Sequence, residues 1–261
     1  MDAKTDAETG AGQTRAPYGV IGLCLSLVTA LALTVILMAA VIGAVFLAMA
    51  ALHGWAGARA ALTSLVAALQ VDNEFSTARL AFGLFLYAAA LVALLLIARW
   101  RGGADWRSLV AWRPPAWPRR DKVLWGIAAF GLVYGLASSA ALGYFYPKSD
   151  SWLLVPRDHL SAGLLLALAV VGAPLVEETY FRGWIYTSLR FRLGMWPAMV
   201  ISALLFGLAH YESTHLYALA VFPLGLVLAA LRERTGSTRT SMLFHAANNL
   251  IAFFSAGLSG S

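Results

Sequence analysis

Apolar residues in this chain are grouped into long continuous stretches rather than alternating with polar ones. Crossing the hydrocarbon layer of a membrane as an α-helix takes about 20 largely apolar residues. Seven uncharged or nearly uncharged runs approach or exceed that length, at residues 18–52, 80–98, 123–146, 160–176, 195–209, 215–231 and 241–258. The pattern predicts an all-α fold, a polytopic membrane helix bundle with about seven transmembrane helices.

Two segments near the N-terminus have their own patterns. The polar residues 1–17, of mixed charge, predict a flexible tail. The apolar run behind them is far longer than the core of a signal peptide, so it predicts a retained helix, long enough to be strongly tilted. Residues 58–70, with a single charge at Arg59, predict a further short helix that lies on the membrane.

The composition agrees with a membrane protein. Of the 261 residues, 60% are hydrophobic and 12% are charged, whereas a soluble chain is about 25% charged. The net charge of +6 could indicate a nucleic-acid partner, but with seven spans fifteen of the 19 lysine and arginine residues fall on one side. Cytoplasmic loops carry such an excess. We therefore expect a multi-pass protein of the inner (plasma) membrane with a cytoplasmic N-terminus and no nucleic-acid partner.

The chain divides at a loop, residues 99–122, that is rich in arginine, tryptophan and proline. We expect residues 18–150 to form peripheral transmembrane helices and this basic cytoplasmic loop. Residues 151–261 are expected to form a catalytic transmembrane core, because the polar residues within apolar runs lie there. The single cysteine, Cys24, excludes a disulfide framework or a cysteine-based metal site within one chain.

Two adjacent glutamates follow the uncharged run 160–176. A carboxylate inside an apolar helix costs several kcal/mol unless it faces protein or water, so such a residue is a candidate for function. Glu178 and Arg182 are four residues apart, which predicts an ion pair on one helical face. Glu177 projects about 100° away from that face, without an obvious local partner, and is the stronger functional candidate.

A helix hairpin is expected to bring Glu177 to a histidine. Glu177 and His210 lie 17 and 16 residues from Gly194, the expected turn. Residues equidistant from the turn of an antiparallel hairpin face each other, so these two side chains should lie at similar depth. The hairpin tip, expected to protrude into the cytoplasm, carries Arg182, Arg190 and Arg192.

The last apolar run carries His245 and Asn249 four residues apart, hence on one face, with Asn248 rotated away. Interhelical hydrogen bonding alone would explain such residues. Together with Glu177 and His210, however, they could activate water through a general base and stabilise an oxyanion. Alternatively, Glu177, His210 and His245 could bind a divalent metal such as zinc with one open position. The sequence leaves both possibilities open.

Three motifs occur in order on the last apolar runs: E-E-x-x-x-R at Glu177, Glu178 and Arg182, F-x-x-x-H at Phe206 and His210, and H-x-x-x-N at His245 and Asn249. They resemble the motifs of the CPBP family, which comprises the type II CAAX prenyl endopeptidases and the bacterial Abi proteins. The resemblance covers roughly residues 160–258.

This resemblance implies an intramembrane endopeptidase with a site that opens to the cytoplasmic leaflet. Glu177 and His210 would activate the water, and His245 with Asn249 would stabilise the oxyanion. The remaining motif residues, Glu178, Arg182 and Phe206, would support them. The substrate would be a membrane protein or lipid-anchored peptide, with a prenylated CAAX-type protein as one option, and the family leaves the metal question open.

Two other functions fit an intramembrane glutamate and histidine. A proton-coupled membrane transporter uses such residues as a relay, and a non-catalytic Abi-type immunity protein would retain the fold alone. Residues 211–215 are expected to line a hydrated cavity or to form part of a broken helix, which makes Glu212 and His215 further candidates. The alternative is that His210 lies near the outer face of the membrane and that the hairpin prediction is wrong.

Overall fold

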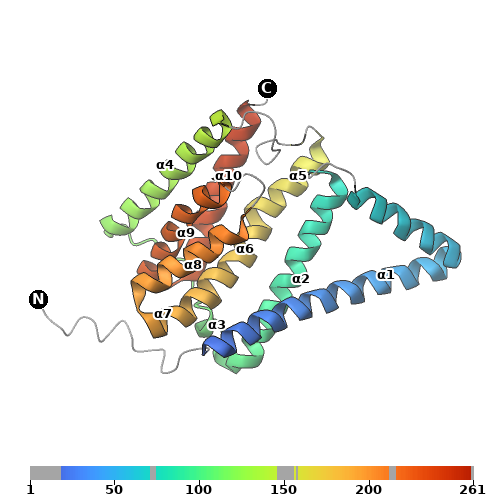
Figure 1. The fold of residues 1–261 in the computed structure, drawn as a ribbon, viewed down its shortest axis with the longest axis horizontal. Helices are drawn as coiled ribbons and strands as arrows, with labels where there is room; N and C mark the ends of the chain where they lie inside the picture. Colours follow the sequence, from blue (N-terminus) through green and yellow to red (C-terminus); the bar gives the residue numbers. More distant parts are fainter. Residues whose placement is uncertain (1–18, 71–74, 146–155, 157, 212–215, 260–261) are drawn as a thin grey trace, which may run out of the picture.

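The computed structural model describes residues 19–70, 75–145, 156, 158–211 and 216–259, and within them every regular element is a helix (Figure 1). The expected flexible tail, Glu212 and His215 lie outside these residues. The longer helices are α1 (Val20–Gln70), α2 (Thr77–Gly102), α4 (Lys122–Phe145), α8 (Met195–Ala209), α9 (Leu216–Thr235) and α10 (Thr238–Ser259). The short ones are η1 (Gly103–Asp105), α3 (Trp106–Leu109), α5 (His159–Ala167), α6 (Ala173–Glu178) and α7 (Thr187–Leu193).

The predicted all-α membrane bundle is confirmed. Among the described residues, five helical segments are long and apolar enough to cross a membrane: α1, α2, α4, the continuous stretch from α5 to α7, and α9. The expected span at 195–209 is α8, which at 15 residues reaches only about 22 Å. The expected span at 241–258 lies in α10, which is not among the five and carries His245 and two asparagines.

Helix α1 diverges from the bundle and returns to it (Figure 1). Its backbone is non-helical at Gly54, with φ 73° and ψ 168°, a conformation open to glycine because it lacks a Cβ. The short helix predicted at 58–70 is present as the second arm of α1, beyond this kink. Near its start, α1 packs Leu23 and Ala30 against Leu94 and Ile97 of α2.

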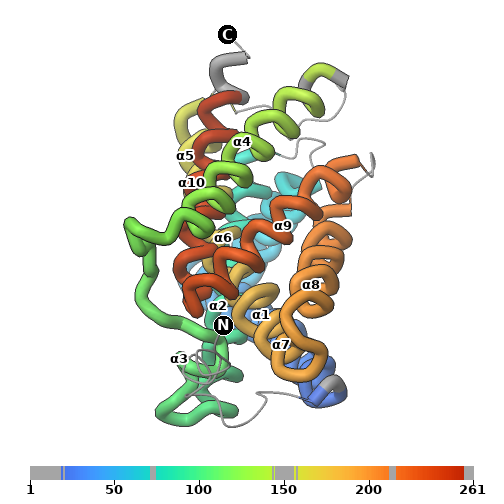
Figure 2. Tube along the Cα trace, turned by 90° about the vertical axis from the view of Figure 1, so that its left-hand side faces the viewer, coloured from blue at the N-terminus to red at the C-terminus, as the bar shows by residue number. Residues whose placement is uncertain are grey.

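The bundle core lies between α4, α8, α9, α10 and the stretch from α5 to α7. Viewed from the side, α4, α9 and α10 lie next to one another and α8 lies beyond α9 (Figure 2). Small residues allow the close approach of α8 and α9, since a Cβ on Gly207 would lie 2.9 Å from the carbonyl oxygen of Ala218. Phe206, Leu228 and Phe244 fill the centre.

The basic loop after α3 folds back onto the connection between α9 and α10. The hydroxyl of Thr238 donates to the carbonyl of Val110 at 2.7 Å, and the hydroxyl of Ser237 donates to that of Arg113 at 2.8 Å. Asp121 directly precedes α4, and the guanidinium of Arg234 on α9 lies 2.8 Å from its carboxylate. This cation lowers the pKa of the Asp121 carboxyl below its ordinary value. The loop thus holds the N-terminal end of α10 in place.

Candidate active site

Two π-helical segments interrupt the helix that carries the adjacent glutamates: η3 (Leu168–Gly172) and η4 (Thr179–Tyr186) enclose the six residues of α6. π-helical turns occur frequently at functional sites. Pro174 cannot donate a backbone hydrogen bond and its ring crowds the preceding turn, which a wider turn accommodates. The changed winding leaves backbone carbonyl oxygens free to accept hydrogen bonds from side chains. The carbonyl oxygen of Phe181 accepts such a hydrogen bond from the hydroxyl of Ser202 at 3.1 Å.

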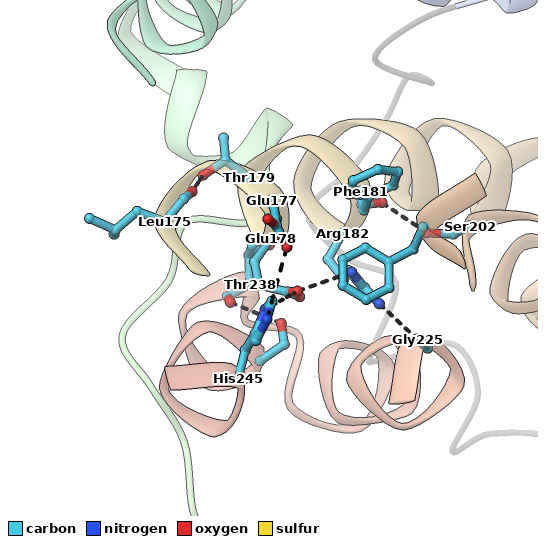
Figure 3. A network of polar contacts seen from close by, with 12 residues as sticks. Leu175, Glu177, Glu178, Thr179, Phe181, Arg182, Ser202, Gly225, Thr238 and His245 are labelled. Atoms are coloured by element: carbon cyan, nitrogen blue, oxygen red, sulfur yellow. Dashed lines mark hydrogen bonds and ion pairs between the residues drawn. The ribbon is translucent and has the colours of Figure 1, made fainter. Parts of the chain in front are cut away.

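The predicted ion pair between Glu178 and Arg182 is present, with 3.0 Å between Oε1 and Nη1, and neither residue has any exposed surface. A second guanidinium nitrogen donates to the carbonyl of Gly225 at 3.0 Å (Figure 3). The ring of Phe206 lies 4.3 Å from the guanidinium carbon. The prediction that Arg182 belongs to a protruding hairpin tip is therefore wrong, because the long helix continues for eleven residues beyond Arg182 to Leu193 before the turn.

Glu178 also holds His245. Its Oε1 atom lies 3.1 Å from Nδ1 of His245, a residue only 4% exposed (Figure 3). A carboxylate oxygen accepts hydrogen bonds, so Nδ1 carries the hydrogen and Nε2 presents its lone pair. Oε1 of Glu178 thus holds both the guanidinium of Arg182 and the imidazole of His245. Because Nδ1 of His245 is bound to it, Nε2 is the nitrogen that faces the site.

His210 has the same tautomer for a different reason. It ends α8, and its Nδ1 lies 2.8 Å from the carbonyl oxygen of Phe206. A carbonyl only accepts, so Nδ1 donates and Nε2 is again free to accept a proton. The ring of Phe206 lies next to both imidazoles, with centroid distances of 4.6 Å to His210 and 5.9 Å to His245.

The two imidazoles converge on one oxygen of Glu177. Its Oε2 atom lies 3.8 Å from Nε2 of His210 and 3.9 Å from Nε2 of His245, and within the described residues it accepts no hydrogen bond although it is buried. The other oxygen, Oε1, accepts a hydrogen bond at 2.9 Å from the hydroxyl of Tyr87 on α2. The hairpin turn at Gly194 brings Glu177 and His210 face to face, as the spacing predicts.

Asn249 lies on the same cavity, and its Nδ2 donates to the carbonyl of Ala169 in η3 at 2.8 Å. The amide has a second N–H for another acceptor. Asn248 is rotated away from Asn249, as predicted, and its Oδ1 atom lies against Gly135 of α4. It nevertheless lines this cavity, because the cavity extends between α10 and α4.

The cavity has a volume of about 410 Å³. Besides the candidate residues, its wall includes Ser139 and Leu142 of α4, Leu165 of α5 and Phe253 of α10. These parts of the three helices lie at the end of the bundle opposite to α3 and the turn after α7 (Figure 1). If the basic loop is cytoplasmic, this is the outer end, which disagrees with the opening toward the cytoplasmic leaflet that the family resemblance implies.

The residues proposed as zinc ligands are spaced more widely around Glu177 than the ligands of a bound zinc. Ligand atoms of a tetrahedral zinc lie about 3.3 Å apart, because Zn–N and Zn–O distances are about 2.0–2.1 Å. The contacts of Glu177 Oε2 with the two imidazoles are longer, and within the part of the chain that the structure describes no three His, Cys, Asp or Glu side chains form a metal-binding group. A water fits better, since hydrogen bonds of about 2.8 Å let it bridge atoms up to about 4.6 Å apart.

Tyr87 is the site residue that sequence reasoning missed. It lies in the apolar run 80–98, from which no acid, base or histidine was expected to reach the site. A hydroxyl within an otherwise apolar span was the available signal, because a buried polar group requires a partner. The long sequence separation of 90 residues from Glu177 gave no means to identify that partner.

The comparison with known proteins agrees with the motifs. The family described as Type II CAAX prenyl endopeptidase Rce1-like matches residues 159–251. This segment is therefore similar to that family. Residues 159–251 include every candidate site residue except Tyr87.

Among curated proteins, an uncharacterized 24.3 kDa protein of Escherichia coli is 38% identical over 132 residues. The alignment covers 49% of this chain and 61% of that relative, so the chain spans less than two thirds of its length. No solved structure matches significantly.

Replacement of Arg182 by alanine should destabilise the protein by about 3–5 kcal/mol, because it leaves the carboxylate of Glu178 buried without its cation. The measurement is the unfolding midpoint in detergent. Arg190→Ala is the matched control: Arg190 pairs with Glu233 at 2.9 Å but is 43% exposed, and such pairs contribute under about 1 kcal/mol. Equal shifts for the two variants would contradict the importance assigned to the buried pair.

Proposed function

We propose that the protein is an intramembrane endopeptidase that hydrolyses a peptide bond with a water activated by Glu177 and His210. The observation that carries the proposal is the convergence of two imidazole lone pairs on a single buried oxygen of Glu177, at the wall of a cavity inside an apolar bundle. The family match of residues 159–251 supports it.

In the proposed first step, a water lies between Oε2 of Glu177 and Nε2 of His210. The water oxygen attacks the carbonyl carbon of the substrate while its proton passes to one of these two acceptors. Both are available because their other polar atoms are already engaged: Oε1 of Glu177 by Tyr87 and Nδ1 of His210 by Phe206. The proton is later delivered to the leaving amine.

The oxyanion of the tetrahedral intermediate would be stabilised by His245 and Asn249. His245 can donate from Nε2 once it is protonated there, and the carboxylate of Glu178 at Nδ1 balances the resulting positive charge. The amide of Asn249 is held by the carbonyl of Ala169 and contributes its second N–H. Glu178 is thus a positioning residue, which acts on the substrate through His245.

The cavity suits a peptide that is anchored in the membrane. A volume of about 410 Å³ is within the range of ligand sites, and its wall combines apolar side chains with serine and asparagine. We infer a membrane protein or lipid-anchored peptide as the substrate in the plasma membrane, and a prenylated CAAX-type segment is the specific candidate.

Glu177→Gln should lower the rate of cleavage of a lipid-anchored fluorogenic peptide at least 100-fold, since general-base catalysis contributes about 10²–10⁴-fold. His245→Ala should have a comparable effect. Glu233→Gln and the exposed His159→Ala are the matched controls and should retain activity. If the wild-type protein transports protons but does not cleave the peptide, the transporter hypothesis is supported. If it neither cleaves nor transports, the hypothesis of a non-catalytic immunity protein is supported.

Removal of metals distinguishes the two hydrolytic mechanisms. We expect full activity after treatment with a chelator and no zinc in the purified protein by elemental analysis, because the ligand spacing around Glu177 suits water better than a metal. Loss of activity on chelation and its recovery on addition of zinc would instead support the metal mechanism, with Glu177, His210 and His245 as ligands.

The direction of access is measurable with a thiol probe. Ser139→Cys in a Cys24→Ser background should react with a membrane-impermeant thiol reagent added outside intact cells, because Ser139 lines the cavity near the end remote from the basic loop. Arg119→Cys in the same background is the control for the cytoplasmic side, because Arg119 lies in the basic loop, and it should react only after the cells are lysed. If Ser139→Cys also reacts only after lysis, the cavity is accessible from the cytoplasm instead.

A further inference from the structure

We propose that Tyr87 of α2 is a positioning residue for Glu177, which fixes the orientation of the carboxylate that acts on water. This inference rests on the proposed function and extends the catalytic unit beyond residues 159–251, to a helix that contributes nothing to the family match. The carrying observation is the 2.9 Å hydrogen bond from the Tyr87 hydroxyl to Oε1 of Glu177.

The two oxygens of Glu177 have different surroundings. Oε1 accepts from Tyr87, whereas Oε2 faces both imidazoles and accepts no hydrogen bond from the described residues. A carboxylate on a helix can rotate about its terminal side-chain bond, and a partial rotation turns the oxygen that faces the imidazoles away from them. The hydrogen bond to Tyr87 opposes this rotation and keeps one oxygen directed at the water position.

The partners of the neighbouring glutamate explain why Glu177 needs such a restraint. Glu178 has an arginine and a histidine on its Oε1 atom, both within 3.1 Å. Glu177 has no cation in hydrogen-bonding contact among the described residues, and its imidazoles are 3.8 and 3.9 Å away. The phenol is neutral, so it orients the carboxylate without neutralising the charge that the general base requires.

The chain offers a matched comparison for the test. Tyr186 is another tyrosine whose hydroxyl donates to a carboxylate, that of Glu233, but it is fully buried and lies outside the cavity. Tyr87→Phe should lower kcat about tenfold and leave KM within about twofold, because it removes the restraint on the carboxylate of Glu177 and not a contact that binds the substrate. Tyr186→Phe should change neither constant by more than about twofold.

Infrared spectroscopy tests the contact without reference to activity. The carboxylate stretching band that is lost in Glu177→Gln should shift in Tyr87→Phe and stay at its wild-type frequency in Tyr186→Phe. If Tyr87→Phe does not fold, fluorotyrosine incorporated at position 87 keeps the hydroxyl, changes its acidity and should shift the same band.

The outcomes separate the two proposals. An unshifted band overturns the role of Tyr87, whatever the activity, as does an equal loss of kcat in Tyr87→Phe and Tyr186→Phe. A shifted band supports the role of Tyr87 at this carboxylate. Absence of cleavage by the wild-type protein overturns the proposed endopeptidase, while the band still reports whether Tyr87 holds Glu177.

Discussion

The buried ion pair between Glu178 and Arg182 is the interaction on which the rest of the site depends. Two charges without exposed surface are stable inside an apolar bundle only if they meet each other and gain further hydrogen bonds. Arg182 gains one by reaching α9 at Gly225, and Glu178 gains one by reaching α10 at His245, while Nε of Arg182 and Oε2 of Glu178 have no hydrogen-bond partner among the described residues. One pair therefore connects three helices and sets the orientation of an imidazole.

The adjacent glutamates illustrate how the environment divides two identical side chains between different tasks. Glu178 is engaged by an arginine and a histidine, so its charge is balanced and its position is fixed. Glu177, one residue earlier, points at two imidazole lone pairs and a neutral hydroxyl. Its charge remains available for proton transfer, which is the property that a general base needs.

The backbone contributes to this division. The π-helical turns before and after α6 change the winding of the helix around Glu177 and Glu178. They also leave the carbonyl of Ala169 accessible to Asn249 and that of Phe181 to Ser202. Departures from regular helix thus coincide with the polar contacts that hold α8 and α10 around the site, which relates the local geometry to the cavity.

The sequence by itself determined the membrane helices, the turn at Gly194, the pairing of Glu178 with Arg182 and the set of candidate polar residues. These features follow from composition, from helical spacing and from the cost of placing polar groups in hydrocarbon, all of which are local properties. Only the tertiary structure decided which oxygen of Glu177 is free, that Arg182 is buried, that Asn248 shares the cavity and that Tyr87 reaches the site. Each of these depends on contacts between helices distant in the sequence, and helical periodicity fixes a residue's face but not what packs against it.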